Sequence, residues 1–312
     1  MNDVTLTLQK IAEELNIDRI GIASLDEPVD ARCMEHYDEW ISSGLHADMA
    51  YLADHRTLRN DPRTLLPEAN SMIVCAVSYY PATLQSETAP QVSKYAYGRD
   101  YHKVLKKVLT AFAERIISEV GEHTYRVCID TAPISERYWA QRTGIGHIGK
   151  NKNIIIPKVG SYVFLGEILT SHVFSRSEPI NKSCGSCTRC VDACPTGALS
   201  LTELDARRCL SYLTIEHRGD IPEDMHKALG TRIYGCDTCQ DVCPYNHNPA
   251  KTRLFPSSQK ILTLSDSDLY PFTEERYAEL FFGSAITRAK YQGMKRNIDI
   301  YFDNKRFRSI VS

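Results

Sequence analysis

Eight of the eleven cysteines in this 312-residue chain lie between residues 184 and 243, in short-spaced groups that constrain the fold more than any other feature. The first group, from Cys184 to Pro195, reads C-x2-C-x2-C-x3-C-P. The second group, from Cys236 to Pro244, reads C-x2-C-x3-C-P and lacks one cysteine at its start, which Cys209 supplies from upstream. This spacing is typical of thiolates that bind [4Fe–4S] cubes, in which the fourth cysteine of a run ligates the other cluster.

This crossing divides the eight cysteines into two complete ligand sets. The first set is Cys184, Cys187, Cys190 and Cys243, and the second set is Cys209, Cys236, Cys239 and Cys194. Zinc is the competing metal because C-x2-C pairs also form tetrahedral zinc sites, but zinc does not require the C-x3-C-P ending of both groups. We therefore predict two [4Fe–4S] clusters. We assign no role to the three remaining cysteines, Cys33, Cys75 and Cys128.

The composition, with 43% hydrophobic and 24% charged residues, is that of an ordinary globular chain. No stretch approaches the roughly 18 apolar residues of a membrane span, and the N-terminus lacks the basic and apolar regions of a signal peptide. We expect a cytoplasmic monomer that does not contact membranes. Between residues 288 and 308, seven basic residues stand against Asp299 and Asp303, so this segment could face a polyanion.

Hydrophobic periodicity predicts an α+β fold with three parts. Helices are expected over residues 101–120 and 136–142, and strands over 72–80, 125–129, 153–157 and 162–170. From residue 183 the chain is rich in Cys, Gly and Pro and too poor in aliphatic residues for a large core of its own. The predicted domains are a mixed α/β domain (1–175), a bacterial-ferredoxin-like dicluster domain (176–250) and a helical basic extension (251–312).

Residues 144–149 match the G-x-G-x-x-G pattern of nucleotide-binding loops, but in the wrong context. The match follows a predicted helix and precedes a predicted strand, whereas a phosphate-binding loop follows a strand and opens a helix. Asn151 also replaces the hydroxyl that would bind Mg²⁺. We interpret these glycines as allowing the backbone to pass close to a flat ligand or to a neighbouring segment of the chain.

The paired clusters predict an electron relay. A stand-alone electron carrier is one alternative, but about 175 residues of α/β domain precede the relay, and a carrier does not need them. We therefore expect a substrate or a cofactor to bind in that domain.

Several segments together resemble the epoxyqueuosine reductases, cobalamin-dependent iron–sulfur enzymes related to reductive dehalogenases. The segments span about residues 45–245, and their combination is more specific than the cysteine motif alone. They are MAYL (49–52) with Arg56 and DPR (61–63), LLPEA (65–69), KYAYGRDYH (94–102), DTAP (130–133), GHIGKN (146–151), FLGEI (164–168), TIEHRG (214–219) and GCDTCQDVCP (235–244).

The resemblance implies reduction of epoxyqueuosine to queuosine at the wobble position of the tRNAs for Asp, Asn, His and Tyr, the last step of queuosine synthesis. Deoxygenating an epoxide requires two electrons, protons and an acid that protonates the leaving oxygen. The implied cofactors are the two clusters, supplied by an external low-potential electron donor, and a cob(II)alamin that is reduced to cob(I)alamin. The α/β domain is then the cobalamin-binding domain.

The family's general acid matches Asp130. A carboxylate that ends an apolar strand is expected to be half-desolvated, which would raise its pKa. The alternative is that Asp130 caps the following helix. The resemblance favours the role of Asp130 as the general acid over that of a helix cap.

The cobalamin contacts follow from the resemblance alone, because the sequence has no D-x-H-x-x-G motif. The implied contacts are Arg56, Tyr97, Asp130, Lys150, Asn151 and Asn153, with Gln240 and Asp241 on the cluster side.

Contacts with the tRNA are expected from the IEHRG segment and from the basic C-terminal segment. The candidates are His217, Arg218, Arg288, Lys295 and Arg296, with Tyr291, Tyr301, Phe302 and Phe307 as stacking side chains. An amphipathic helix with a solvated basic face is an equal alternative. Many relatives continue into a helical-repeat module, whereas this sequence ends at Ser312. We expect either that the terminal helix replaces part of the contacts between that module and the tRNA or that tRNA affinity is weaker and more salt-dependent.

Two other functions stay open at this point. A small-molecule corrinoid reductase of the reductive dehalogenase type would use the same relay and cofactor but would not need the basic segment. A non-catalytic dicluster electron carrier would bind two clusters and no cobalamin.

Overall fold

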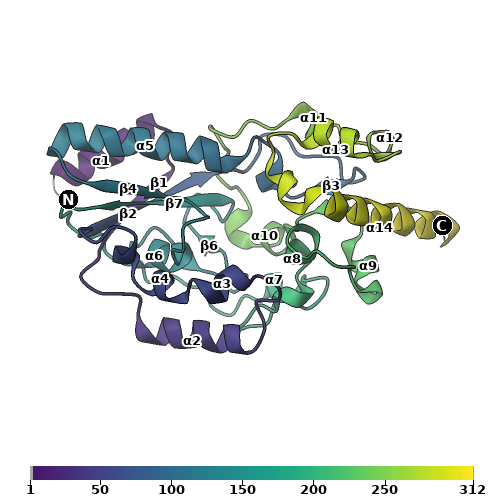
Figure 1. Cartoon of the computed structure of the whole chain (residues 1–312), viewed down its shortest axis with the longest axis horizontal. Helices are drawn as coiled ribbons and strands as arrows, with labels where there is room; N and C mark the ends of the chain where they lie inside the picture. Colours follow the sequence, from purple (N-terminus) through teal and green to yellow (C-terminus); the bar gives the residue numbers. More distant parts are fainter. Residues whose placement is uncertain (1–2, 312) are drawn as a thin grey trace.

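A four-stranded antiparallel sheet forms the centre of the N-terminal half (Figure 1). The computed structural model describes residues 3–311, with side chains for residues 4–306. The strand order is β1-β2-β7-β4. All eight residues of β2 are buried because this strand lies inside the sheet and both of its faces are covered. The strands are β1 (Arg19–Ser24), β2 (Ser71–Ser78), β4 (Tyr125–Cys128) and β7 (Val163–Thr170).

Helices cover both faces of the sheet (Figure 1). Because side chains alternate along a strand, Ile73 and Val77 of β2 pack in one core with α1 and α5, whereas Val74 and Ala76 pack in a second core with Trp139 of α6. Three further helices, α2 to α4, lie outside α6. The helices of this half are α1 (Asp3–Glu14), α2 (Ala31–Ser42), α3 (Ala50–Asp54), α4 (Arg56–Asn60), α5 (Tyr101–Val120) and α6 (Glu136–Arg142).

The glycine-rich segment after α6 forms a small hairpin of β5 (His147–Ile148) and β6 (Ile154–Ile155). Gly144 has a φ of +72°, and a Cβ there would lie 2.0 Å from the carbonyl oxygen of Glu178. A Cβ on Gly146 would lie 2.6 Å from the carbonyl oxygen of Ile155. The glycines therefore permit the close approach of neighbouring chain segments, and the segment continues into a strand, a context that does not suit a phosphate-binding loop.

The cysteine-rich half shares a core with the C-terminal helices. Val92 and Tyr97 pack in one apolar cluster with Ile233 and with Met294 and Ile298 of α14. The short strand β3 (Gln91–Val92) also pairs in parallel with β8 (Arg232–Tyr234). Segments from all three predicted domains therefore contribute to this core, and the boundaries at 175 and 250 stay a prediction.

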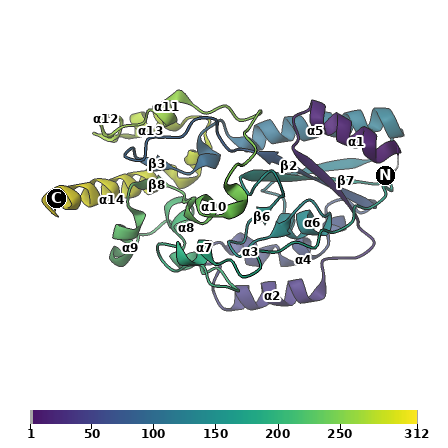
Figure 2. The same cartoon turned by 180° about the vertical axis from the view of Figure 1, so that it is seen from behind.

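Figure 2 shows α14 extending away from the sheet, with the C-terminus at the end of the molecule far from the N-terminus. The helices of this half are α7 (Arg189–Asp192), α8 (Leu210–Ile215), α9 (Glu223–Leu229), α10 (Thr238–Asp241), α11 (Gln259–Leu262), α12 (Asp266–Leu269), α13 (Glu274–Phe281) and α14 (Lys290–Val311). Short 3-10 turns are η1 (Pro62–Thr64), η2 (Lys94–Ala96), η3 (Ala206–Arg208), η4 (Pro244–Asn246) and η5 (Ala285–Ala289).

The α+β fold class is confirmed, and the helices predicted over residues 101–120 and 136–142 have the predicted bounds. The helices α2 to α4 were not predicted. In α2 only Met34 is buried, and α3 and α4, with five residues each, are too short to show a helical period. Of the helices described over residues 3–311, none is both long enough and apolar enough to cross a membrane.

Candidate active site

The eight clustered cysteines form two neighbourhoods that correspond to the crossed ligand sets. Burial raises the pKa of Cys243, and the nearby thiols of Cys184, Cys190 and Cys187 raise it further. Burial also raises the pKa of Cys209, and the thiols that raise it further belong to Cys236 and Cys194. The fourth cysteine of each motif thus lies beside the other group, the arrangement that crossed ligation requires.

The surroundings of these cysteines suit cubane clusters. All eight side chains are partly exposed, and four thiolates hold each cube. Lys150 ties the first motif to the glycine hairpin, because its Nζ donates to the carbonyl oxygens of Gly185 and Cys187, both at 2.9 Å. Within residues 3–311, no three His, Cys, Asp or Glu side chains converge on the position of a single ion; the thiolates of a cube bind separate iron atoms.

A cleft of about 930 Å³ lies beside the second cysteine neighbourhood. All four cysteines of that set line it, together with Asp130 from the loop that follows β4. A cavity of this size accommodates a large cofactor or a splayed-out nucleotide. The cysteines that line the cleft are Cys194, Cys209, Cys236 and Cys239.

Asp130 lies in the cleft with a protonatable partner. Its Oδ2 lies 3.0 Å from Nε2 of His102, and its side chain is about half exposed. Partial burial acts to raise the pKa of Asp130, but hydrogen bonds with His102 and Tyr101 and the charge of His102 outweigh it, so the pKa lies below its ordinary value. The expected rise of this pKa is therefore wrong. The capping alternative is also wrong, because the N-cap of α6 is Ser135.

His102 is held between two carboxylates. Its Nδ1 lies 2.7 Å from Oδ1 of Asp100, and its ring stacks on Tyr101 with centroids 4.1 Å apart. The hydrogen bond with Asp130, and in addition that with Asp100, raise the pKa of His102 to about 9 although burial opposes them. At neutral pH this imidazole is therefore protonated, and both ring nitrogens donate. Sequence reasoning gave His102 no role, although the KYAYGRDYH segment contains it.

Two further carboxylates lie behind Asp130. Glu136 is the first residue of α6, and its Oε1 accepts a hydrogen bond from the backbone N–H of Asp130 at 2.9 Å. Burial and the charge of Asp130 raise the pKa of Glu136 to about 7. Glu167 on β7 is fully buried, and neither of its carboxylate oxygens has a hydrogen-bond partner among the described residues. Burial raises the pKa of Glu167 well above its ordinary value, which favours the uncharged form of this carboxyl.

The residues predicted to contact cobalamin divide into two groups. Asn151, Asn153 and Gln240 line the cleft with Asp130. The other four are engaged elsewhere. Arg56 pairs with Asp38, Tyr97 is buried in the C-terminal core, Lys150 binds the first cysteine motif, and Asp241 pairs with Lys94.

Among the residues predicted to contact tRNA, Arg288 alone lines the cleft. Its guanidinium forms two hydrogen bonds with the carboxylate of Glu216. Arg218 and Arg296 donate instead to backbone carbonyl oxygens, and His217 hydrogen-bonds with Asp48. These contacts give three of the predicted residues a structural role, and their contact with tRNA stays a prediction.

The terminal helix α14 carries both a buried face and a basic face. Tyr301 is 2% exposed, so its ring is not available for the stacking expected of it. Lys295 forms an ion pair with Asp299 one turn later, at 2.7 Å, and both side chains are about half exposed. The side chains of Phe307 and Arg308 lie outside the described residues.

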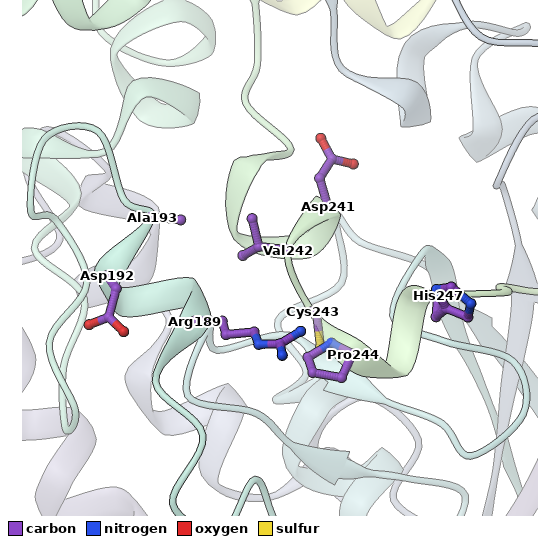
Figure 3. Close-up of a pocket in the computed structure, with 8 residues that line it drawn as sticks. All are labelled: Arg189, Asp192, Ala193, Asp241, Val242, Cys243, Pro244 and His247. Carbon is purple, nitrogen blue, oxygen red and sulfur yellow. The ribbon is translucent and has the colours of Figure 1, made fainter.

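A second hollow lies beside the first cysteine neighbourhood, between α7 and α10 (Figure 3). The hollow is open to solvent, and Cys243 is the one cysteine among the residues that line it. Figure 3 shows the guanidinium of Arg189 pointing toward Cys243 and Pro244. This face therefore brings the first cysteine set close to the surface.

Comparisons with known proteins agree with both halves of the chain. Residues 183–246 match the family model "4Fe-4S double cluster binding domain", and residues 59–131 match "Epoxyqueuosine reductase QueG, DUF1730". The epoxyqueuosine reductase of Leadbetterella byssophila is 39% identical over 96% of this chain and 98% of its own length.

Solved structures of epoxyqueuosine reductases superpose closely on this chain. One, with an epoxyqueuosine-modified tRNA-Tyr stem loop, has a TM-score of 0.83 and 30% identity over 96% of this chain and 81% of its own. Another, from Bacillus subtilis, has its catalytic aspartate loop swung out of the active site, with a TM-score of 0.85 and 29% identity over 98% of this chain and 82% of its own.

Proposed function

Since the chain belongs to the epoxyqueuosine reductase family, we propose that it reduces epoxyqueuosine to queuosine at the wobble position of the tRNAs for Asp, Asn, His and Tyr. The reaction removes the epoxide oxygen as water, leaves a carbon–carbon double bond, and consumes two electrons and two protons. The observation that carries the proposal is the shared cleft, in which Asp130 and His102 line the same cavity as four cluster cysteines. A proton source and an electron source thus meet at one site.

The eight cysteines would hold two [4Fe–4S] clusters that supply electrons from a low-potential donor outside the chain. The first set of cysteines lies beside an open hollow and the second set lines the cleft, so the first cluster would lie nearer the donor and the second nearer the substrate. The neighbourhoods of Cys243 and Cys209 support the crossed ligand sets.

Cobalamin would bind in the cleft, beside the second cluster. Asn151, Asn153 and Gln240 would hold its amides, because amide side chains both donate and accept hydrogen bonds. When bound, cobalamin would supply a low-potential, nucleophilic cobalt centre for the reduction. Arg56, Tyr97, Lys150 and Asp241 do not line this cleft, so their contact with the cofactor would require a rearrangement.

Asp130 and His102 hold and transfer the proton that the leaving oxygen needs. At neutral pH the imidazole holds it and the carboxylate is ionised, so the pair presents one proton at a contact of 3.0 Å. Transfer from Nε2 of His102 to Oδ2 of Asp130 makes the carboxyl the acid that protonates the leaving oxygen. Asp100 stabilises the protonated ring from its other nitrogen.

The tRNA reaches the cleft past Arg288. Its guanidinium is about half exposed at the cleft, where it can exchange Glu216 for a phosphate. The half-exposed Lys295 on α14 offers a further cation on the C-terminal helix. Both contacts position the anticodon loop; neither reads a base.

The test is mass spectrometry of nucleosides from epoxyqueuosine-containing tRNA, incubated anaerobically with the cluster-loaded protein and a low-potential reductant, with cobalamin present or omitted. We expect loss of one oxygen only when cobalamin is present, and a corrin absorption band on the purified complex. If a protein loaded with both clusters and a corrin left the nucleoside unchanged, the substrate would instead be a small molecule. Conversion without cobalamin would exclude the proposed cofactor.

A further inference from the structure

The loop that carries Asp130 has a strained backbone and few tethers of its own. Asp130 has a φ of +41°, in the left-handed region that few non-glycine residues occupy, although aspartate occupies it more readily than most of them. The loop runs from Ile129, at the end of β4, to Ser135, which caps α6 without a side-chain hydrogen bond. Both ends are fixed, because Ile129 and Ile134 are buried in the two cores of the sheet. Within the loop, the N–H of Ala132 donates to the carbonyl oxygen of Ile129, and Arg59 donates to the carbonyl oxygen of Ile134. The position of Asp130 depends in addition on contacts of its own.

The contacts of Asp130 act on two different groups. His102 and Tyr101 bind the side chain, and Glu136 binds the backbone N–H at 2.9 Å. A carboxylate that accepts an N–H forms a stronger hydrogen bond than a neutral acceptor does. The contact with Glu136 leaves the carboxyl of Asp130 free to react while it fixes the peptide that determines φ.

We propose that Glu136 is a positioning residue whose carboxylate holds the Asp130 loop, residues 129–135, in the closed arrangement that places Asp130 beside His102 in the cleft. The inference rests on the proposed function and identifies what sets the position of its acid. Without Glu136, the strain at Asp130 favours a relaxed loop in which the carboxyl leaves the cleft.

The groups that face Glu136 fit this role. Asp130 and Glu167 lie near it as carboxyls, and Arg137 and Arg59 act on it as cations. Neither carboxylate oxygen of Glu167 has a hydrogen-bond partner among the described residues, and the acceptor of the Asp130 N–H is Glu136. Burial and the charge of Asp130 raise the pKa of Glu136 to about 7, so its hold on the loop strengthens as the pH rises through neutrality.

The test compares Glu136→Ala and Glu136→Gln with the wild type, all loaded with clusters and cobalamin. Hydrogen–deuterium exchange is measured by mass spectrometry on peptides that cover residues 125–140. We expect exchange in the Glu136→Ala loop to rise about tenfold, the population change that follows loss of one charge-assisted hydrogen bond. Glu136→Gln should exchange at an intermediate rate, because its amide oxygen still accepts. Glu119→Ala, which removes an exposed carboxylate from α5, serves as the matched control and should match the wild type.

Kinetics separate positioning from a general loss of structure. In Glu136→Ala, kcat should fall about tenfold while KM for tRNA stays within about twofold, and Glu136→Gln should recover most of kcat. Unchanged loop exchange in Glu136→Ala would overturn the proposal even if the activity fell. An inactive wild type with normal loop exchange would instead count against the proposed function, since the exchange experiment needs no substrate.

Discussion

Asp130→Asn is the substitution that most directly tests the site. It keeps the size of the side chain but removes the carboxylate that faces Nε2 of His102 at 3.0 Å. The hydrogen bond with Asp130 is the largest contribution to the raised pKa of His102, about 9. In the variant this pKa falls, and position 130 can no longer carry an acidic proton. Turnover should drop by a factor of about 10² to 10⁴, the usual contribution of a general acid.

The energy stored in the His102–Asp130 pair is modest and depends on pH. A rise of the His102 pKa from 6.5 to about 9 corresponds to about 3.4 kcal/mol at 1.36 kcal/mol per unit. The two side chains are 35% and 53% exposed, and solvent screening reduces the contribution to roughly 1–2 kcal/mol. Because the folded pKa lies above the unfolded one, this stabilisation is complete below about pH 6.5 and is lost as the pH rises through about 9. The same titration removes the stored proton, so turnover should decline over the same range.

The assay is single-turnover conversion of epoxyqueuosine-containing tRNA between pH 6 and pH 10, followed by mass spectrometry. Iron content and the corrin spectrum should be unchanged in Asp130→Asn, which shows that the loss lies in the chemistry. Asp100→Asn is the matched control, because it removes the other carboxylate from His102 and still caps α5. The control should retain turnover and lose it at a lower pH than the wild type. An active Asp130→Asn enzyme, or a wild type whose rate does not fall toward pH 10, would refute the reasoning.

Four further substitutions test other parts of the structure. Cys243→Ser should remove the cluster of the first cysteine group and Cys194→Ser that of the second, as judged by iron content and electron paramagnetic resonance; the reverse pattern would exclude crossed ligation. Glu167→Gln should raise the thermal midpoint at pH 8 more than at pH 5, because a buried carboxyl with a raised pKa destabilises the fold increasingly above its unfolded pKa of 4.5; equal shifts measured by circular dichroism would contradict this. Arg288→Gln should raise KM for tRNA and lower the slope of log affinity against log salt by about one; an unchanged slope would exclude a phosphate contact.

The cluster ligands were predictable because their signal is local in the sequence. The spacings within each cysteine group span only a few residues, so they identify the clusters without knowledge of the fold. The helix over residues 101–120 was predictable for the same reason, since its apolar stripe recurs every three to four residues. Both predictions depend only on residues that lie close together in the sequence.

The electrostatics of Asp130 were not predictable in this way. The strand end before it correctly indicated partial burial, but His102 lies 28 residues upstream and α5 brings it within 3.0 Å. The contacts with His102 and Tyr101 together reverse the direction of the Asp130 pKa shift. The contact of Glu136 with the Asp130 N–H was also missed, because a hydrogen bond across six residues leaves no periodic pattern.

Two residues that were predicted to contact the cofactor show what else the family segments encode. Asp241 accepts a hydrogen bond from Lys94 at 2.6 Å, and Gln240 pairs with the hydroxyl of Tyr79 at the end of β2. These bonds connect the second cysteine motif to segments that precede it by about 140 to 160 residues. The cluster cysteines, which supply electrons, and the Asp130–His102 pair, which supplies the proton, come from different parts of the chain. The distance between them across the cleft therefore depends on such polar contacts. A residue of these segments is therefore constrained by the geometry between the two sources even where it touches neither cofactor nor substrate.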